Sequence, residues 1–140
     1  MLRTVAAVLA GLVAAIAVIT LVEAVGHSIY PPPPGIDPMA PDGMAAIVAQ
    51  MPPAALVFVL FALVCGGLAG GAVSARIASA RGLTEALVVG ALLTIASLLN
   101  VFSVPHPIWM GALSVAIPLP AAWLGARLIT RRRGSESVGR

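Results

Sequence analysis

Long apolar runs separated by short polar or proline-rich stretches dominate the pattern along the chain. Four such runs cover Thr4–Tyr30, Pro53–Ile77, Leu83–Val104 and Ile108–Thr130. A helix needs roughly 20 mostly apolar residues to cross the hydrocarbon core of a bilayer, and each run is long enough. The pattern predicts an all-α membrane protein, folded as a bundle of four transmembrane helices.

The stretch between the first two runs predicts a shorter helix. Pro31–Pro34 stop the first helix, because proline lacks the N–H that a helix interior needs. Apolar residues then recur at helical spacing before the next pair of prolines: Met44, Ile47, Val48 and Met51. We expect a short interfacial helix over residues 42–51 in the first outer loop, with Asp42 as its N-cap. An irregular loop is the alternative.

Proline also interrupts the fourth run. Pro118 cannot donate a backbone hydrogen bond to the carbonyl of Ser114, so we expect a kink near the middle of that helix. Residues 1–133 are predicted to form a single transmembrane domain, followed by a polar tail over residues 134–140.

The composition points to lipid as the solvent. Hydrophobic residues make up 60% of the 140 residues and charged residues only 9%, whereas soluble domains carry about 25% charged residues. The chain therefore cannot cover a surface with groups that water solvates. The lipid bilayer is the expected partner, and no cofactor is indicated.

The basic residues are all arginines and stand near the ends of the apolar runs. They are Arg3, Arg76, Arg81, Arg127, Arg131, Arg132, Arg133 and Arg140. Cytoplasmic loops of membrane proteins carry the excess of basic residues. This bias predicts a multi-pass membrane protein with both termini in the cytoplasm (N-in/C-in). Because the arginines are scattered and form no single patch, we expect no nucleic-acid partner.

Small residues form two adjacent stripes on the second long helix. Each stripe repeats every four residues: Gly66, Gly70 and Ser74 in one, and Gly67, Gly71 and Ala75 in the other. In lipid, helices associate through close backbone approach at such residues. The stripes predict tight packing, either within the chain or against another chain in a homo-oligomer or a larger membrane complex.

Polar residues gather at the end of the bundle opposite the arginines. Thr20, Glu23, His27 and Tyr30 are spaced three or four apart and predict one stripe on the first helix that faces other protein. The assigned topology puts Asn100 and His106 at the same outer level, and Thr94 and Ser97 extend the polar zone inward. We predict a polar vestibule from these residues.

Three interpretations of this vestibule remain open. Its groups can hydrogen-bond to one another and to water, and so fix how the helices cross. Glu23 and His27 can form a titratable pair that serves as a proton relay or pH sensor. Glu23, His27 and His106 can instead be the ligands of a metal ion.

The motifs resemble those of a group of small uncharacterised bacterial inner-membrane proteins. The shared features are Glu-x-x-x-His followed by Tyr-Pro-Pro-Pro, a Gly-Gly-x-x-Gly-Gly helix ending in Ala-Arg, and Asn followed by Pro-His-Pro-x-Trp. Here they are Glu23, His27, Tyr30–Pro33, Gly66, Gly67, Gly70, Gly71, Ala75, Arg76, Asn100, Pro105–Pro107 and Trp109. The resemblance spans nearly the whole chain and implies the four-helix architecture, without an activity.

The sequence favours a protein that acts without catalysis. It contains no nucleophile elbow, no phosphate-binding loop and no paired carboxylates within the apolar runs. We expect an accessory or assembly subunit, or a self-associating membrane protein. The alternative is a small proton- or metal-linked transporter or sensor that uses the Glu/His vestibule. A lateral cleft lined by Glu23 and His106 would favour an enzyme acting on a lipid or quinone.

Overall fold

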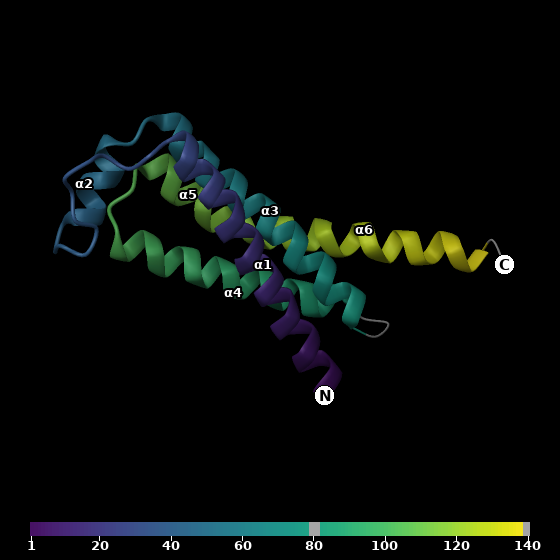
Figure 1. Ribbon diagram of the computed structural model, residues 1–140. Coiled ribbons are helices and arrows are strands. Elements are labelled where there is room, and N and C mark those ends of the chain that lie inside the picture. Colours follow the sequence, from purple (N-terminus) through teal and green to yellow (C-terminus); the bar gives the residue numbers. More distant parts are fainter. Residues whose placement is uncertain (79–81, 139–140) are drawn as a thin grey trace.

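The computed structural model describes residues 1–78 and 82–138, with side chains described as far as Arg131. The described chain is all helical (Figure 1). Its elements are α1 (Leu2–Ile29), α2 (Gly43–Gln50), α3 (Pro53–Ile77), α4 (Gly82–Ser103), α5 (Ile108–Ala116) and α6 (Pro118–Val138).

Four stretches of helix are long and apolar enough to cross a membrane. They are Leu2–Ile29, Pro53–Ile77, Gly82–Ser103 and Ile108–Arg131, the last combining α5 with most of α6. Large apolar side chains such as Val13, Phe61 and Leu99 are exposed on their outer faces. Lipid solvates such faces at no cost, whereas a soluble protein must bury them. The predicted fold class, an all-α bundle with four candidate membrane spans, is confirmed.

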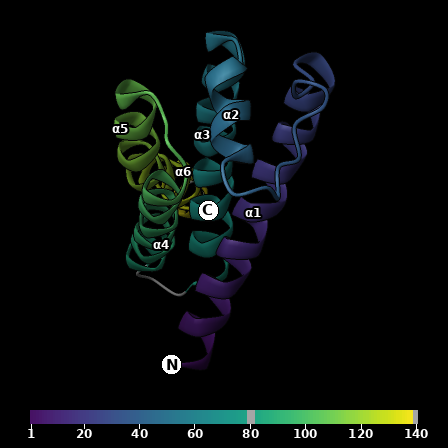
Figure 2. The ribbon, with the colours of Figure 1, turned by 90° about the vertical axis from the view of Figure 1, so that its left-hand side faces the viewer.

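Helix α3 occupies the centre of the bundle. It packs against α1 on one side and against α6 and α5 on the other, and α4 contacts α1, α3, α5 and α6. Figure 2 shows α1 and α5 on opposite sides of α3. Within the described residues α1 touches neither α5 nor α6, so the bundle is open along one side.

The small residues of α3 allow this central position. A Cβ atom built on Gly66 would lie 2.3 Å from the side chain of Ile19 in α1, and one on Gly71 would lie 2.0 Å from the carbonyl oxygen of Ala122 in α6. Both distances are far below van der Waals contact. One stripe therefore packs against α1 and the other against α6, both within the same chain.

The fourth span is divided where Pro118 predicts a kink. Helix α5 ends at Ala116 and α6 begins at Pro118, with Ile117 between them. Pro118 is buried, and its carbonyl oxygen lies 3.2 Å from a Cβ built on Gly67. The break thus sits against the glycine face of α3.

A short helix, α2, follows the proline-rich loop, as the apolar spacing predicts. Asp42 holds the N-cap position, but the expected side-chain cap is not formed. The backbone supplies the local bonds, since Gly43 N–H donates to the carbonyl of Ala40 and Ala46 N–H to that of Asp42. Asp42 is therefore a cap by position only.

Both termini and the start of α4 lie at one end of the molecule, and α2 lies at the other (Figure 1). At the terminal end, the Nε of Arg3 donates a hydrogen bond to the carbonyl oxygen of Ile77, 2.7 Å away, and ties α1 to α3. Helix α6 continues to Val138, so residues 134–138 of the predicted tail are helical. Residues 139 and 140, like Arg81, lie outside the described residues.

Candidate functional site: a lateral cavity between α1, α4 and α5

Polar side chains of α1, α4, α5 and the segment between α4 and α5 line a cavity of about 270 Å³, here called the lateral cavity. Helices α1, α3, α4 and α5 and the segment between α4 and α5 all contribute to its wall. The lining residues are Ile16, Ile19, Glu23, Val59, Leu63, Leu93, Ala96, Ser97, Asn100, His106, Met110 and Ser114. Ile16 in α1 and Ala96 and Asn100 in α4 are exposed, so the cavity opens sideways between these two helices.

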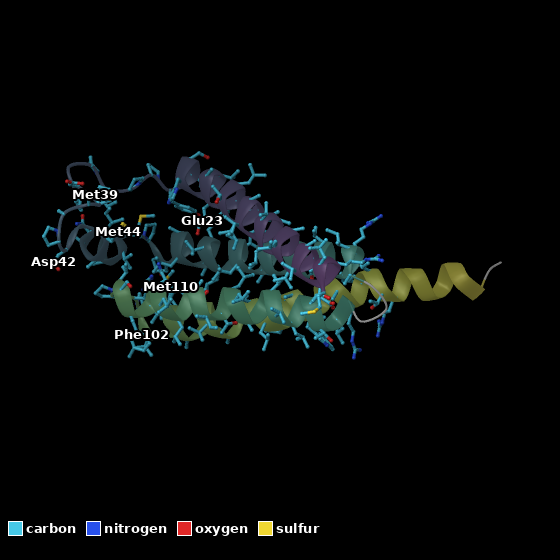
Figure 3. The ribbon with its side chains drawn as sticks, turned by 90° about the horizontal axis from the view of Figure 1, so that it is seen from below. Glu23, Met39, Asp42, Met44, Phe102 and Met110 are labelled. Atoms are coloured by element: carbon cyan, nitrogen blue, oxygen red, sulfur yellow. The ribbon has the colours of Figure 1, made fainter. Side chains whose placement is uncertain are left out.

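The lateral cavity has a polar end and an apolar end. Glu23 lies near the end of α1, Asn100 near the end of α4, and His106 just before α5, so all three stand toward the α2 end of the molecule. Figure 3 places Glu23 on α1 and Met110 on α5 in this half of the bundle. Ile16, Leu63 and Leu93 stand about two helical turns deeper. The cavity is therefore amphipathic along its length.

Several polar groups in this cavity have no protein partner. The side chains of Glu23, Ser97 and Asn100 make no hydrogen bond or ion pair with the described residues. His106 uses Nδ1 to donate to the carbonyl of Val104, and Ser114 donates to the carbonyl of Gly111. A carboxyl, an amide and the Nε2 of an imidazole are left to bind water or a ligand.

The predicted stripe on α1 is divided between two surroundings. Thr20 and His27 are exposed and do not line the lateral cavity, while Glu23 and Tyr30 are half buried. Successive residues turn by about 100° around a helix, so Glu23 is rotated by roughly 40–60° from Thr20 and His27. That rotation puts Glu23 and Tyr30 on the inner flank, and the expectation that the whole stripe faces protein is wrong for Thr20.

A second, smaller cavity of about 30 Å³ lies on the other side of Glu23. Glu23, His27 and Tyr30 line it together with Gly26 of α1 and Phe58 of α3. Gly26 permits this contact, because a Cβ at that position would lie 2.7 Å from the Phe58 ring. Its volume is that of about one water molecule, so it does not extend the ligand space.

Thr94 lies apart from the other α4 residues of the predicted vestibule. Its hydroxyl is buried and makes no hydrogen bond with the described residues, and it does not line the lateral cavity. Ser97 and Asn100, one and two turns further along α4, do line it. The vestibule is thus shallower on α4 than the sequence predicts.

The predicted metal ligands do not come together. In the described part of the chain, no three His, Cys, Asp or Glu side chains stand close enough to hold a metal ion. His27 lines only the smaller cavity, whereas His106 lines the lateral cavity from beyond α4. Glu23 is adjacent to both cavities but supplies a single carboxyl.

Met110 and Ser114 are part of the site but were not predicted from the sequence. Both are buried, line the lateral cavity and belong to α5. They are spaced four apart, so a single helix face carries them, and that spacing was the available signal. Glu85 is also buried, which was not predicted from the sequence, and its Oε2 makes no hydrogen bond with described residues. It lies at the start of α4, away from this cavity.

Comparison with known proteins gives no identification. No family model matches the chain, and neither a curated protein nor a solved structure matches it. The function of the protein is therefore inferred from the residues that line the lateral cavity.

Proposed function

We propose that the protein is a non-enzymatic integral membrane protein that binds a small amphiphilic molecule in the lateral cavity, as a transporter or sensor. The observation that carries the proposal is the set of unpartnered polar side chains of Glu23, Ser97 and Asn100 inside an otherwise apolar cavity. The carboxyl, hydroxyl and amide groups of these side chains can hydrogen-bond a bound molecule, and each such bond contributes about 0.5–1.5 kcal/mol.

The shape of the lateral cavity supports an amphiphile as the occupant. Its polar end would take a headgroup, and its apolar end, lined by Ile16, Leu63 and Leu93, would take part of a chain. The side opening between α1 and α4 gives a route from the bilayer. Binding sites for small molecules are usually apolar cavities with a few convergent polar groups, as here.

The setting proposed for this binding is the bacterial inner membrane. Every arginine of the sequence lies within residues 1–3, 76–81 or 127–140, and the described parts of these ranges lie toward the end of the bundle that carries the N-terminus and the end of α6. The preference for basic residues in the cytoplasm then places both termini inside, with α2 as an interfacial helix on the opposite face. The polar end of the lateral cavity faces the outer leaflet.

Filling the cavity tests the proposal. Ser97→Leu places a bulky apolar side chain in the lateral cavity, whereas Thr20→Leu makes the same kind of change at an exposed position on α1. Mass spectrometry of small molecules extracted from the purified proteins should find an amphiphile in the wild type and in Thr20→Leu, but not in Ser97→Leu. Recovery of no bound amphiphile from wild-type protein, purified from native membranes in mild detergent, would contradict the proposal.

A role as an accessory or assembly subunit, or as a self-associating protein, is the second candidate. It is favoured by the exposure of α1, of which only Ala7, Gly11, Ala15 and Gly26 are buried. This leaves a long apolar face that a helix of another chain can cover. The test is copurification from native membranes, where a stoichiometric protein companion or a discrete oligomer supports this role and an isolated monomer opposes it.

An enzyme that acts on a lipid or quinone would also need a lateral cavity lined by Glu23 and His106. We propose binding instead, because the cavity offers one carboxyl and one imidazole whose Nδ1 is engaged by Val104. The extracted molecule distinguishes the two: after incubation with fresh protein, a ligand is recovered unchanged and a substrate is converted.

A further inference from the structure

We infer that the molecule bound in the lateral cavity is a single-chain amphiphile with a primary ammonium headgroup, held by the carboxyl group of Glu23. This inference rests on the proposed function and specifies the class of ligand. Charge, hydrogen bonding and size each contribute to it.

The charges around the lateral cavity favour a cationic headgroup. Neither Lys nor Arg occurs in residues 4–75 or 82–126, which include every residue that lines the lateral cavity. Among the described residues, the carboxyl of Glu23 therefore has no guanidinium or ammonium partner. The imidazole of His27 is the neighbouring basic group and lines the smaller cavity together with Glu23, but it does not line the lateral cavity. A cationic headgroup would supply the counter-charge that the cavity itself lacks.

The hydrogen-bond acceptors of the lateral cavity favour a primary ammonium group. A primary ammonium group has three N–H donors and no acceptor. The polar end of the cavity offers the acceptors that it needs, in the carboxyl of Glu23, the amide oxygen of Asn100 and the Nε2 of His106. Charge-assisted hydrogen bonds of this kind are about twice as strong as neutral ones.

The same composition argues against an ordinary phospholipid headgroup. An aminophospholipid also carries an ammonium group, but its phosphate would enter the polar end as an anion. No basic side chain of the described lining could pair with it there, apart from the imidazole of His106. Burying an unpaired anion beside the Glu23 carboxyl is strongly unfavourable.

The size of the lateral cavity favours a ligand with a single alkyl chain. The cavity volume of about 270 Å³ lies below the roughly 300–1,000 Å³ that is usual for drug-sized ligands. From Glu23 to Ile16 the wall of α1 spans seven residues, or about 10 Å. One headgroup and the first part of one alkyl chain fit this space, with the rest of the chain passing through the side opening into lipid.

Binding of matched probes tests the inference. The protein is placed in phosphatidylcholine nanodiscs and titrated calorimetrically with dodecylammonium, dodecyl sulfate or dodecyl maltoside, which share one chain and differ in headgroup. Empty nanodiscs correct for partitioning into lipid. We expect saturable binding of dodecylammonium alone, and at least a tenfold weaker affinity in Glu23→Gln, which keeps the size of the side chain and removes its charge.

Asp42→Asn is the matched control, because it removes a carboxyl at the same end of the molecule but outside the lateral cavity. It should bind dodecylammonium like the wild type. Nanodiscs that also contain phosphatidylethanolamine should bind the probe equally well, since the lipid form of the ammonium is not expected to compete. Competition by this lipid would overturn the choice of a single-chain ligand.

The outcomes separate this inference from the proposed function. If all three probes bind alike and Glu23→Gln has no effect, while Ser97→Leu abolishes binding, the cavity binds amphiphiles but the cationic headgroup is refuted. If no probe binds above the empty nanodiscs, and extraction also recovers no amphiphile from the wild type, the proposed function fails as well.

Discussion

Glycine residues, which have no side chain, determine how closely α1 and α6 approach α3. Gly11 of α1 and Gly70 of α3 face each other, and a Cβ atom on either would lie 2.8 Å from the carbonyl oxygen of the other. On the opposite side of α3, Gly71 lies against the backbone of Ala122. In lipid, where burying apolar surface gives no net gain, such close packing supplies much of the attraction between helices.

Substitution at Gly71 should therefore be far more damaging than at Gly111. A Cβ on Gly71 would lie 2.0 Å from a backbone oxygen that cannot move aside, while one on Gly111 would meet only the Val101 side chain, at 3.3 Å. We expect Gly71→Ala to lower the free energy of unfolding by about 2–3 kcal/mol. Gly111→Ala should change it by less than about 1 kcal/mol, since alanine also favours the helix. Unfolding in mixed detergent micelles measures both, and equal effects would contradict the packing described.

The charge at Glu23 is the other feature of residue scale. The sequence marks it as the only acid within an apolar run apart from Glu85 near a helix start, which is enough to single it out as a candidate. What its neighbours are depends on α3, α4 and α5, which the sequence does not place relative to α1.

At the scale of the elements, the fourth span shows how one residue divides a helix. Pro118 lacks an N–H, and its ring crowds the preceding turn, so α5 and α6 are separate helices joined at Ile117. The hydrogen bond from Ala121 N–H to the carbonyl of Ile117 restarts the regular pattern. On both sides of the break the span packs against α3 and α4.

Pro118→Ala should straighten this span. Spin labels at the exposed positions Ala112 and Leu128 lie 16 residues apart, which is about 24 Å along a straight helix. We expect the measured distance to lengthen toward this value, because alanine restores the missing donor. The same labels in the wild-type chain give the reference, and an unchanged distance would show that packing on α3, rather than proline, holds the bend.

At the scale of the whole molecule, the described arginines lie toward one end and the polar end of the lateral cavity lies toward the other. This asymmetry predicts the orientation in the membrane. In a Cys65→Ala background, Met39→Cys lies in the loop before α2 and Thr84→Cys at the start of α4, and both positions are exposed. A membrane-impermeant maleimide added to intact cells with a permeabilised outer membrane should label Met39→Cys but not Thr84→Cys. Labelling of Thr84→Cys alone would reverse the orientation.

Much of this molecule follows from its sequence. Apolar length gives four candidate spans, proline gives the C-terminal end of α1 and the break at Pro118, and the four-residue glycine repeats indicate the surface of α3 that other helices approach. These are local properties, because a single helix satisfies the hydrogen bonds of its own backbone in lipid, whatever its neighbours are.

Only the tertiary structure decides what depends on the relative rotation and crossing of helices. It assigns both glycine stripes to partners within the chain, leaves Thr20 and His27 out of the lateral cavity that Glu23 lines, and brings Ser97, Asn100, His106 and Ser114 to that cavity. A rotation of about 50° about one helix axis exchanges a cavity-facing side chain for a lipid-facing one. An apolar sequence leaves that rotation free, because lipid and protein are nearly equivalent surroundings for its side chains.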